Sequence, residues 1–177
     1  KAQYISDYFS IRKAELEKVL DSITPKLYGF CIALSRSEKE AQQMFVDAYT
    51  VFILKEKNFV SEMQFDEESK KDRITAKRYF LNEILKEVYE LARMRNPRNR
   101  YDNSSFLEYE SFYDLNIQKR AILYLKDVAN MSVEDLQEIF VMQRHQVIEL
   151  LHNSYYGLVK DISDTNKKRN EFRGELS

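Results

Sequence analysis

Six polar side chains between positions 143 and 153 are of types that can hydrogen-bond to the edges of nucleic-acid bases. In the major groove of DNA, arginine pairs with guanine and glutamine with adenine through two hydrogen bonds. Histidine and asparagine can reach a base edge or a phosphate oxygen. The residues are Gln143, Arg144, His145 and Gln146, followed further along by His152 and Asn153. Their types and spacing predict a segment that can contact DNA.

The segment that holds these side chains has the pattern of a helix-turn-helix. Ser132 is a predicted N-cap, and Glu134 and Asp135 follow it in the first turn, where the helix dipole favours acidic residues. In the DNA-binding form of this motif, the N-terminal residues of the second helix contact bases. Apolar residues recur at helical spacing on both sides of a short break: Leu136, Ile139 and Phe140, then Val147, Leu150, Leu151, Tyr155 and Leu158.

Basic residues are also concentrated upstream of this motif. Two interpretations carry equal weight: the cations lie in solvent at a helix end, where the dipole favours them, or they contact DNA phosphates. The whole chain shows no basic excess, because 28 Lys and Arg are balanced by 29 Asp and Glu. The candidate DNA-contacting residues of this region are Lys77, Arg78, Arg93, Arg95, Arg98 and Arg100.

Metal or enzymatic chemistry finds little support in the sequence. His145 and His152 are too far apart for two ligands on adjacent helical turns, and no cysteine or carboxylate accompanies them at metal-site spacing. No glycine-rich loop that could hold a phosphate is present. We therefore expect a protein without catalytic activity, metal or cofactor.

The elements that must position these residues are predicted to be helices. With 3 glycines and 2 prolines in 177 residues, long helices with few sharp turns are expected, so the predicted fold class is all-α. We predict two small helical domains, at residues 1–99 and 113–163. A polar linker at 100–112 joins them, and a charged, frayed tail follows at 164–177. Ser37, with Glu40 three residues later, predicts the start of one helix.

The location of the protein is predicted from its cysteine and its apolar runs. Cys31 lies among apolar residues and is predicted to be a small core residue in a reducing compartment. No apolar run approaches the roughly 20 residues of a membrane span, and no signal-peptide pattern opens the chain. We expect a cytoplasmic protein.

From Leu115 to Leu158 the chain resembles the C-terminal promoter-recognition domain of the extracytoplasmic-function sigma factors of bacterial RNA polymerase. The resemblance implies that this part binds promoter DNA through its helix-turn-helix. The matching residues are Leu115, Arg120, Ile122, Leu125, Lys126-Asp127-Val128, Ser132, Glu134-Asp135-Leu136, Glu138-Ile139, Val147 and Leu151-His152.

The N-terminal half resembles the same family over two segments. The first is similar to the helix that docks on the polymerase in that family, through Leu27-Tyr28, Phe30, Leu34, Ala41, Met44, Asp47, Ala48-Tyr49 and Phe59. The second, residues 76–100, is similar to the helix that engages the downstream promoter element and helps to open the duplex. The resemblance implies core RNA polymerase, bound around Gln43 and Asp47, promoter DNA and a possible anti-sigma factor as partners.

Two hypotheses follow, because the chain departs from the family pattern at several contact positions. The first is a divergent alternative sigma factor that directs RNA polymerase to promoters. The second is a sigma-like interaction module that has lost promoter binding and binds an anti-sigma-type regulator or another protein. Apolar residues in the second helix of the motif favour the second hypothesis if they are exposed, because exposed apolar surface usually binds a protein partner. These residues are Ile148, Leu150, Tyr155 and Tyr156.

Overall fold

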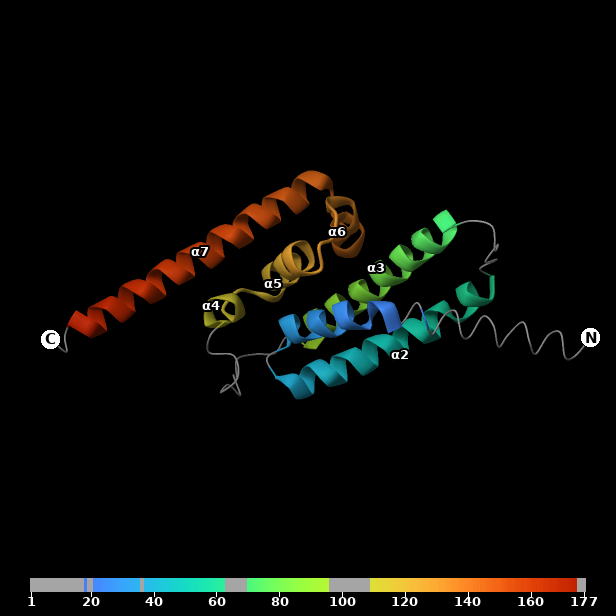
Figure 1. The fold of residues 1–177 in the computed structure, drawn as a ribbon, viewed down its shortest axis with the longest axis horizontal. Helices are drawn as coiled ribbons and strands as arrows, with labels where there is room; N and C mark the ends of the chain where they lie inside the picture. The colour runs from blue at the N-terminus through green and yellow to red at the C-terminus, as the bar shows by residue number, and fades with distance from the viewer. Residues whose placement is uncertain (1–17, 19–20, 36, 63–69, 96–108, 175–177) are drawn as a thin grey trace, which may run out of the picture.

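The computed structural model describes residues 18, 21–35, 37–62, 70–95 and 109–174, and these parts are helical wherever they have regular structure (Figure 1). No strand occurs among them, which confirms the all-α prediction. After a helix at residues 21–34, the elements are α2 (Glu38–Glu62), α3 (Lys70–Arg95), α4 (Glu110–Tyr113), α5 (Ile117–Leu123), the π-helix η2 (Tyr124–Val128), α6 (Val133–Phe140) and α7 (Arg144–Gly174).

Side-chain caps explain where several of these helices begin. Ser37 Oγ accepts the backbone N–H of Glu40 at 3.2 Å at the start of α2, as the sequence predicts. Ser132 caps α6 in the same way, and the Asp135 side chain in turn accepts the Ser132 N–H, which completes a capping box. Asn116 Oδ1 accepts the Lys119 N–H at 2.9 Å and begins α5. Each of these oxygens satisfies a donor that would otherwise lack a helical partner.

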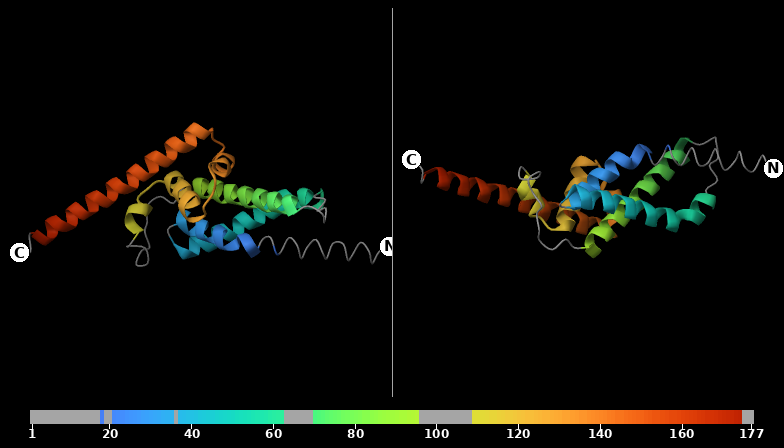
Figure 2. Two further views of the ribbon diagram at one scale, coloured as in Figure 1. Left: turned by 45° about the horizontal axis from the view of Figure 1, so that its top comes forward. Right: turned by 90° about the horizontal axis from the view of Figure 1, so that it is seen from below.

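The N-terminal half is a three-helix arrangement formed by residues 21–34, α2 and α3. The helices α2 and α3 lie along each other, and their apolar faces meet the helix at residues 21–34 (Figure 2). The rings of Phe52 and Phe80 pack edge to face, with centroids 5.7 Å apart. Cys31 is fully buried, and burial raises its pKa to about 12. This confirms its predicted place in the core.

The C-terminal half packs α5, α6 and the first part of α7 around Leu136, Ile139 and Val147, which are buried. α7 continues as a helix to Gly174, and its C-terminal part extends beyond the other helices (Figures 1 and 2). The sequence predicts a frayed tail from residue 164, so this prediction differs from the structure. The reason is that neither proline nor glycine interrupts residues 158–173, so nothing stops the helix.

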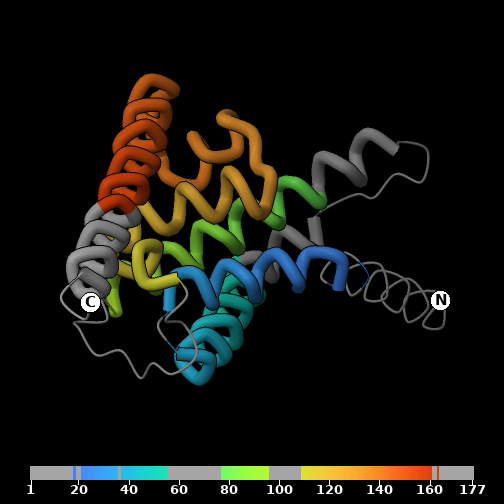
Figure 3. Tube along the Cα trace, turned by 60° about the vertical axis from the view of Figure 1, so that its left-hand side comes forward, coloured from blue at the N-terminus to red at the C-terminus, as the bar shows by residue number. Residues whose placement is uncertain are grey.

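The two halves are packed against each other through one hydrophobic cluster that contains buried residues of both (Figure 3). Tyr113 Oη donates to the carbonyl of Ile32 at 3.2 Å, and Arg120 Nη1 donates to the carbonyl of Ala33 at 3.2 Å. The predicted linker at 100–112 falls mostly outside the described residues, and its last residues belong to α4. The division into two domains stays a prediction. None of the described helices is both long and apolar enough to cross a membrane.

Candidate nucleic-acid interface

A tight turn orients α7 relative to α6. Val141 ends α6 with φ 54° and ψ 52°, and the backbone N–H of Met142 donates to the carbonyl of Gln137 at 3.1 Å. This left-handed conformation is strained for a β-branched residue, so packing of the two helices must hold it. The side chain of Gln146 then accepts the backbone N–H of Gln143 at 2.8 Å and begins α7. The two helices and the turn of the predicted helix-turn-helix are therefore present in the structure.

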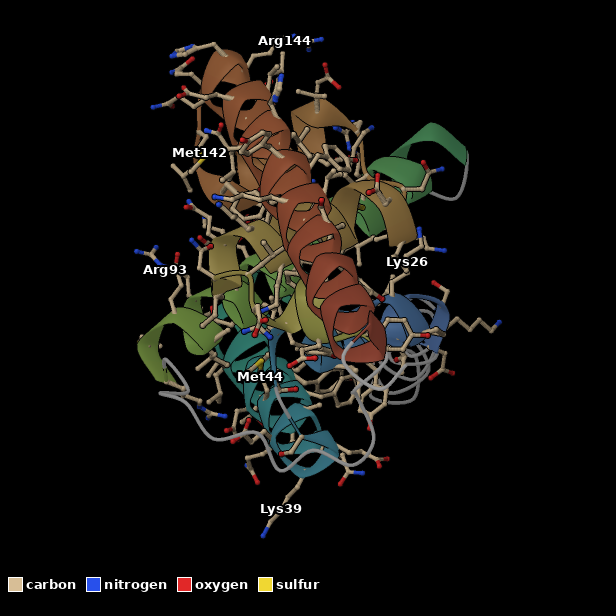
Figure 4. All side chains as sticks on the ribbon, turned by 90° about the vertical axis from the view of Figure 1, so that its left-hand side faces the viewer. Lys26, Lys39, Met44, Arg93, Met142 and Arg144 are labelled. Carbon is tan, nitrogen blue, oxygen red and sulfur yellow. The ribbon has the colours of Figure 1, made fainter. Side chains whose placement is uncertain are left out.

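The six residues predicted to face DNA from this motif are all exposed. Gln143, Arg144, His145 and Gln146 lie together at the start of α7, and Figure 4 shows Arg144 projecting from that end of the molecule. His152 and Asn153 lie about two turns further along α7. Arg144 Nη1 donates to Glu134 Oε1 of α6 at 2.7 Å, in an exposed ion pair. A pair of this kind is weak and can exchange for a DNA contact.

Several apolar side chains are exposed on one face of α7 between Ile148 and Val159. Ile148, Tyr155 and Val159 share this face by their spacing, with exposed fractions of 49%, 39% and 66%, and Tyr156 beside them is 68% exposed. Leu150 differs, because it is only partly exposed and packs against the core. Of the four apolar residues that favour a protein partner, three are thus exposed.

The basic residues of α3 are not gathered into one patch. Lys77 and Arg78 lie in its N-terminal half and Arg93 and Arg95 at its C-terminal end, so the rise of the helix separates the two pairs by about 22 Å. All of them are exposed, and in Figure 4 Arg93 projects well away from Arg144. Arg93 Nη1 lies 3.5 Å from Glu90 Oε1. The two remaining candidates, Arg98 and Arg100, lie outside the described residues.

A polar network joins α3 to α6, and the sequence did not reveal it. Arg78 Nε donates to Asp135 Oδ1 at 2.5 Å, while Asn82 Nδ2 donates to Asp135 Oδ1 at 2.9 Å and to Glu138 Oε2 at 2.7 Å. Burial of Asp135 favours its neutral form, but hydrogen bonds from Asn82, Ser132 and Arg78 outweigh this effect and hold its pKa at about 2. Asn82 is buried, and no motif singles it out. We name these four residues, Arg78, Asn82, Asp135 and Glu138, the α3–α6 network.

The two residues predicted to bind the polymerase are engaged with each other. Gln43 Nε2 donates to Asp47 Oδ1 at 2.8 Å, and Arg95 of α3 forms an ion pair with the same carboxylate. The hydrogen bond from Arg95, followed by that from Gln43, holds the pKa of Asp47 below its usual value. A partner that contacts the Asp47 carboxylate must therefore bind beside Arg95 or replace Arg95 in the ion pair.

Binding of a metal ion requires several ligating side chains close together. The described residues contain no group of three or more His, Cys, Asp and Glu side chains that could hold a metal ion.

The chain matches no protein-family model, and no curated protein is similar to it at a significant level. Among solved structures it is similar to the sigma factor RpoE from Bartonella quintana, crystallised in complex with the anti-sigma factor NepR. The superposition covers 84% of this chain and 96% of that chain, with a TM-score of 0.58 and 16% sequence identity. At this identity the likeness establishes the fold alone. The fold is similar to that of this sigma factor.

Proposed function

We propose that this chain is a sigma-like transcription factor that binds core RNA polymerase and directs it to promoter DNA. One observation carries the proposal: Gln143, Arg144, His145 and Gln146 are exposed together at the first turn of the second helix of a helix-turn-helix, on a sigma-like fold. This is the position from which recognition helices contact base edges. The proposal assigns the chain no catalytic step and no cofactor.

DNA binding by the chain alone is expected to be weak. Affinity for DNA depends strongly on the number of phosphates that lysine and arginine neutralise. Along the described part of α7 as far as Lys160, the cations are Arg144 and Lys160, and Arg144 is paired with Glu134. Polymerase would therefore supply part of the binding free energy, and the chain would supply the sequence preference.

Engagement of α3 with DNA would require a change at the α3–α6 network. Arg78, one of the α3 cations predicted to contact DNA, is bound to Asp135. If a DNA phosphate replaced Asp135 as the partner of Arg78, the buried Asp135 carboxylate would lose one of its hydrogen-bond donors. Leaving a buried acceptor with fewer donors costs free energy. We therefore propose that the halves separate at this network when α3 meets DNA.

The test of sequence reading is selection of bound sequences from a random DNA pool, with core RNA polymerase present and absent. The proposal predicts an enriched motif, and Arg144→Ala should relax its specificity at one position, by about 1–3 kcal/mol for a bidentate base contact. Glu134→Ala is the matched control, because it breaks the same ion pair and keeps the arginine. Failure to enrich any motif, even with polymerase present, would remove promoter reading from the proposal.

A second candidate function is supported by the exposed apolar face of α7. Ile148, Tyr155, Tyr156 and Val159 would suit a protein partner better than a phosphate backbone. The structurally similar RpoE was crystallised with an anti-sigma factor. In this account the chain binds an anti-sigma-type regulator through α7.

Substitutions on the exposed apolar face of α7 separate the two candidates. Tyr156→Asp and Val159→Asp should abolish a complex with a purified anti-sigma-type regulator and leave DNA selection unchanged. Leu54→Asp is the control, because it adds the same charge at an exposed apolar position on α2. A regulator that binds all three variants equally well would exclude this face as its docking site.

A further inference from the structure

A pocket of about 380 Å³ lies where the helix at residues 21–34 meets α4, η2 and α7. It lies between segments of both halves, where Arg120 of α5 and Tyr124 of η2 donate hydrogen bonds to backbone carbonyls of the helix at residues 21–34. The volume falls within the range of about 300–1,000 Å³ that is typical of small-molecule sites. The lining residues are Gly29, Ile32, Ala33, Tyr109, Phe112, Tyr113, Leu123, Tyr124, Asp127, Val128 and Leu158.

The pocket walls are apolar and aromatic, and two of the three tyrosine hydroxyls among them have partners elsewhere. Tyr113 Oη donates to the carbonyl of Ile32, and Tyr124 Oη donates to the carbonyl of Lys26 at 3.4 Å, so both phenol groups bond to backbone of the helix at residues 21–34. Gly29 permits this close approach, because a Cβ atom there would lie 2.0 Å from Tyr124 Oη. The rings thus present their apolar faces to the pocket.

One carboxylate stands at this apolar surface. Asp127 lines the pocket and accepts the Tyr155 hydroxyl on Oδ1 at 2.6 Å, and an ionised carboxylate has acceptor sites beyond that one bond. Asp127 belongs to the π-helix η2, of whose 5 residues Tyr124, Asp127 and Val128 line the pocket. Single π-helical turns are rare and occur frequently at functional sites.

We propose that this pocket binds a small aromatic or aliphatic amine, with its apolar body between Phe112, Val128 and Leu158 and its ammonium group at Asp127. An apolar pocket of this size gains from burying an apolar body. The carboxylate then favours a cation over a neutral group of the same shape, because a charge-assisted hydrogen bond is stronger than a neutral one. The chemistry excludes anions, which Asp127 repels.

The proposal is tested with three probes that share a phenylethyl group and differ in the charge of the group attached to it: 2-phenylethylamine, 2-phenylethanol and 3-phenylpropanoate. Backbone amide shifts of the full chain are followed by NMR in a buffer of physiological ionic strength. For ligands this small we expect the amine to bind with Kd of about 1 mM. We expect the alcohol to bind about fivefold more weakly, and the anion not to bind. Shifts should concentrate at Gly29 and Val128.

Two substitutions make the test specific to the pocket. Asp127→Asn should remove the preference for the amine over the alcohol and retain binding of both. Val128→Trp should fill the pocket and abolish binding of both. Val159→Trp is the matched control, because Val128 and Val159 are each 66% exposed and only Val128 lines the pocket. That control variant should bind the probes as the unmodified chain does.

Three results would overturn the proposal. The first is the absence of saturable shifts with the amine. The second is equal binding of amine and alcohol to the unmodified chain. The third is binding that survives Val128→Trp, which would place the probes elsewhere. Thermal unfolding of each variant shows that it is folded before its binding is compared.

Discussion

Arg78 of α3 donates a hydrogen bond to Asp135 of α6, with Nε 2.5 Å from Oδ1. The helix proposed to engage DNA is thus bonded to the first helix of the helix-turn-helix. Asn82 reinforces this contact from a buried position, and the rings of Tyr89 and Phe140 pack beside it with centroids 4.8 Å apart. The α3–α6 network therefore joins α3, to which the proposed function assigns DNA contact, to the helix that precedes α7 in the helix-turn-helix.

The first prediction concerns the pH dependence of stability. The pKa of Asp135 is about 2 in the folded chain, against an ordinary 3.8. A carboxyl group whose pKa is lowered by folding stabilises the folded state above its unfolded pKa, and this contribution is lost as pH falls through the folded pKa. After allowance for solvent screening, we expect Asp135 to contribute about 1–2 kcal/mol near neutral pH, and this to decline between about pH 4 and pH 2.

Urea unfolding of the unmodified chain and of Asp135→Asn measures this contribution as a difference. The difference in free energy of unfolding should be constant above about pH 5 and shrink on acidification. Glu149→Gln, at an exposed position on α7, is the control and should change stability little. A difference that stayed the same from neutral pH to about pH 3 would contradict the assigned pKa.

The second prediction concerns two helical glycines with different surroundings. At Gly29 an added Cβ would lie 2.0 Å from Tyr124 Oη and 3.1 Å from Tyr124 Cζ, so Gly29→Ala must displace the ring. We expect a loss of about 1–3 kcal/mol, which exceeds the gain in helix propensity of about 1 kcal/mol.

Gly157 is the matched comparison. A Cβ there would meet Leu115 Cδ2 at 3.2 Å and Lys119 Nζ at 3.5 Å, and both are ends of flexible side chains. Gly157→Ala should therefore be neutral or stabilise the chain by up to about 1 kcal/mol. Thermal and urea unfolding compare the two variants, and equal losses at both positions would disprove the distinction.

The third prediction concerns the proposed polymerase contact at Asp47. If the carboxylate meets core RNA polymerase, Asp47→Ala should weaken the complex by about tenfold. Arg95→Gln should leave polymerase binding unchanged or tighten it, because it releases the Asp47 carboxylate from its ion pair. Glu38→Ala, at an exposed position in the first turn of α2, is the control. Equal weakening by Asp47→Ala and Arg95→Gln would instead indicate a structural role for the pair.

The fourth prediction concerns the salt dependence of DNA binding. If Arg93 and Arg95 contact phosphates, Arg93→Gln with Arg95→Gln should weaken binding to all sequences. The slope of log affinity against log salt should fall by about one unit for each lost contact. Lys18→Gln with Lys39→Gln removes the same charge at exposed positions of the N-terminal half and should preserve the slope. An unchanged slope in the arginine variant would leave those cations as solvated surface charge.

Local features of this fold were predictable from the sequence, and contacts between distant segments were not. Ser132 and Ser37 were predicted as caps because their hydroxyls serve donors within three residues. The exposure of the α7 apolar residues was predicted only in part. Periodicity alone did not distinguish Leu150, which packs against the core, from Tyr156, which is exposed to solvent.

The α3–α6 network illustrates why the rest could not be predicted. Asp135 belongs to a recognisable N-terminal pattern of α6, but its bonds to Arg78 and Asn82 depend on how two helices far apart in sequence pack. The same holds for the pocket, whose lining combines Asp127 and Val128 of η2 with residues of the helix at residues 21–34. No spacing within one segment carries such information.

The most direct test of the proposed function is transcription in vitro with purified core RNA polymerase and a pool of genomic DNA fragments, with sequencing of the transcript 5′ ends. The account predicts transcripts that require the chain, that start at a fixed distance from a shared sequence motif, and that lose this preference in Arg144→Ala but not in Glu134→Ala. Identical start sites with and without the chain, together with the absence of a complex with core polymerase, would contradict it.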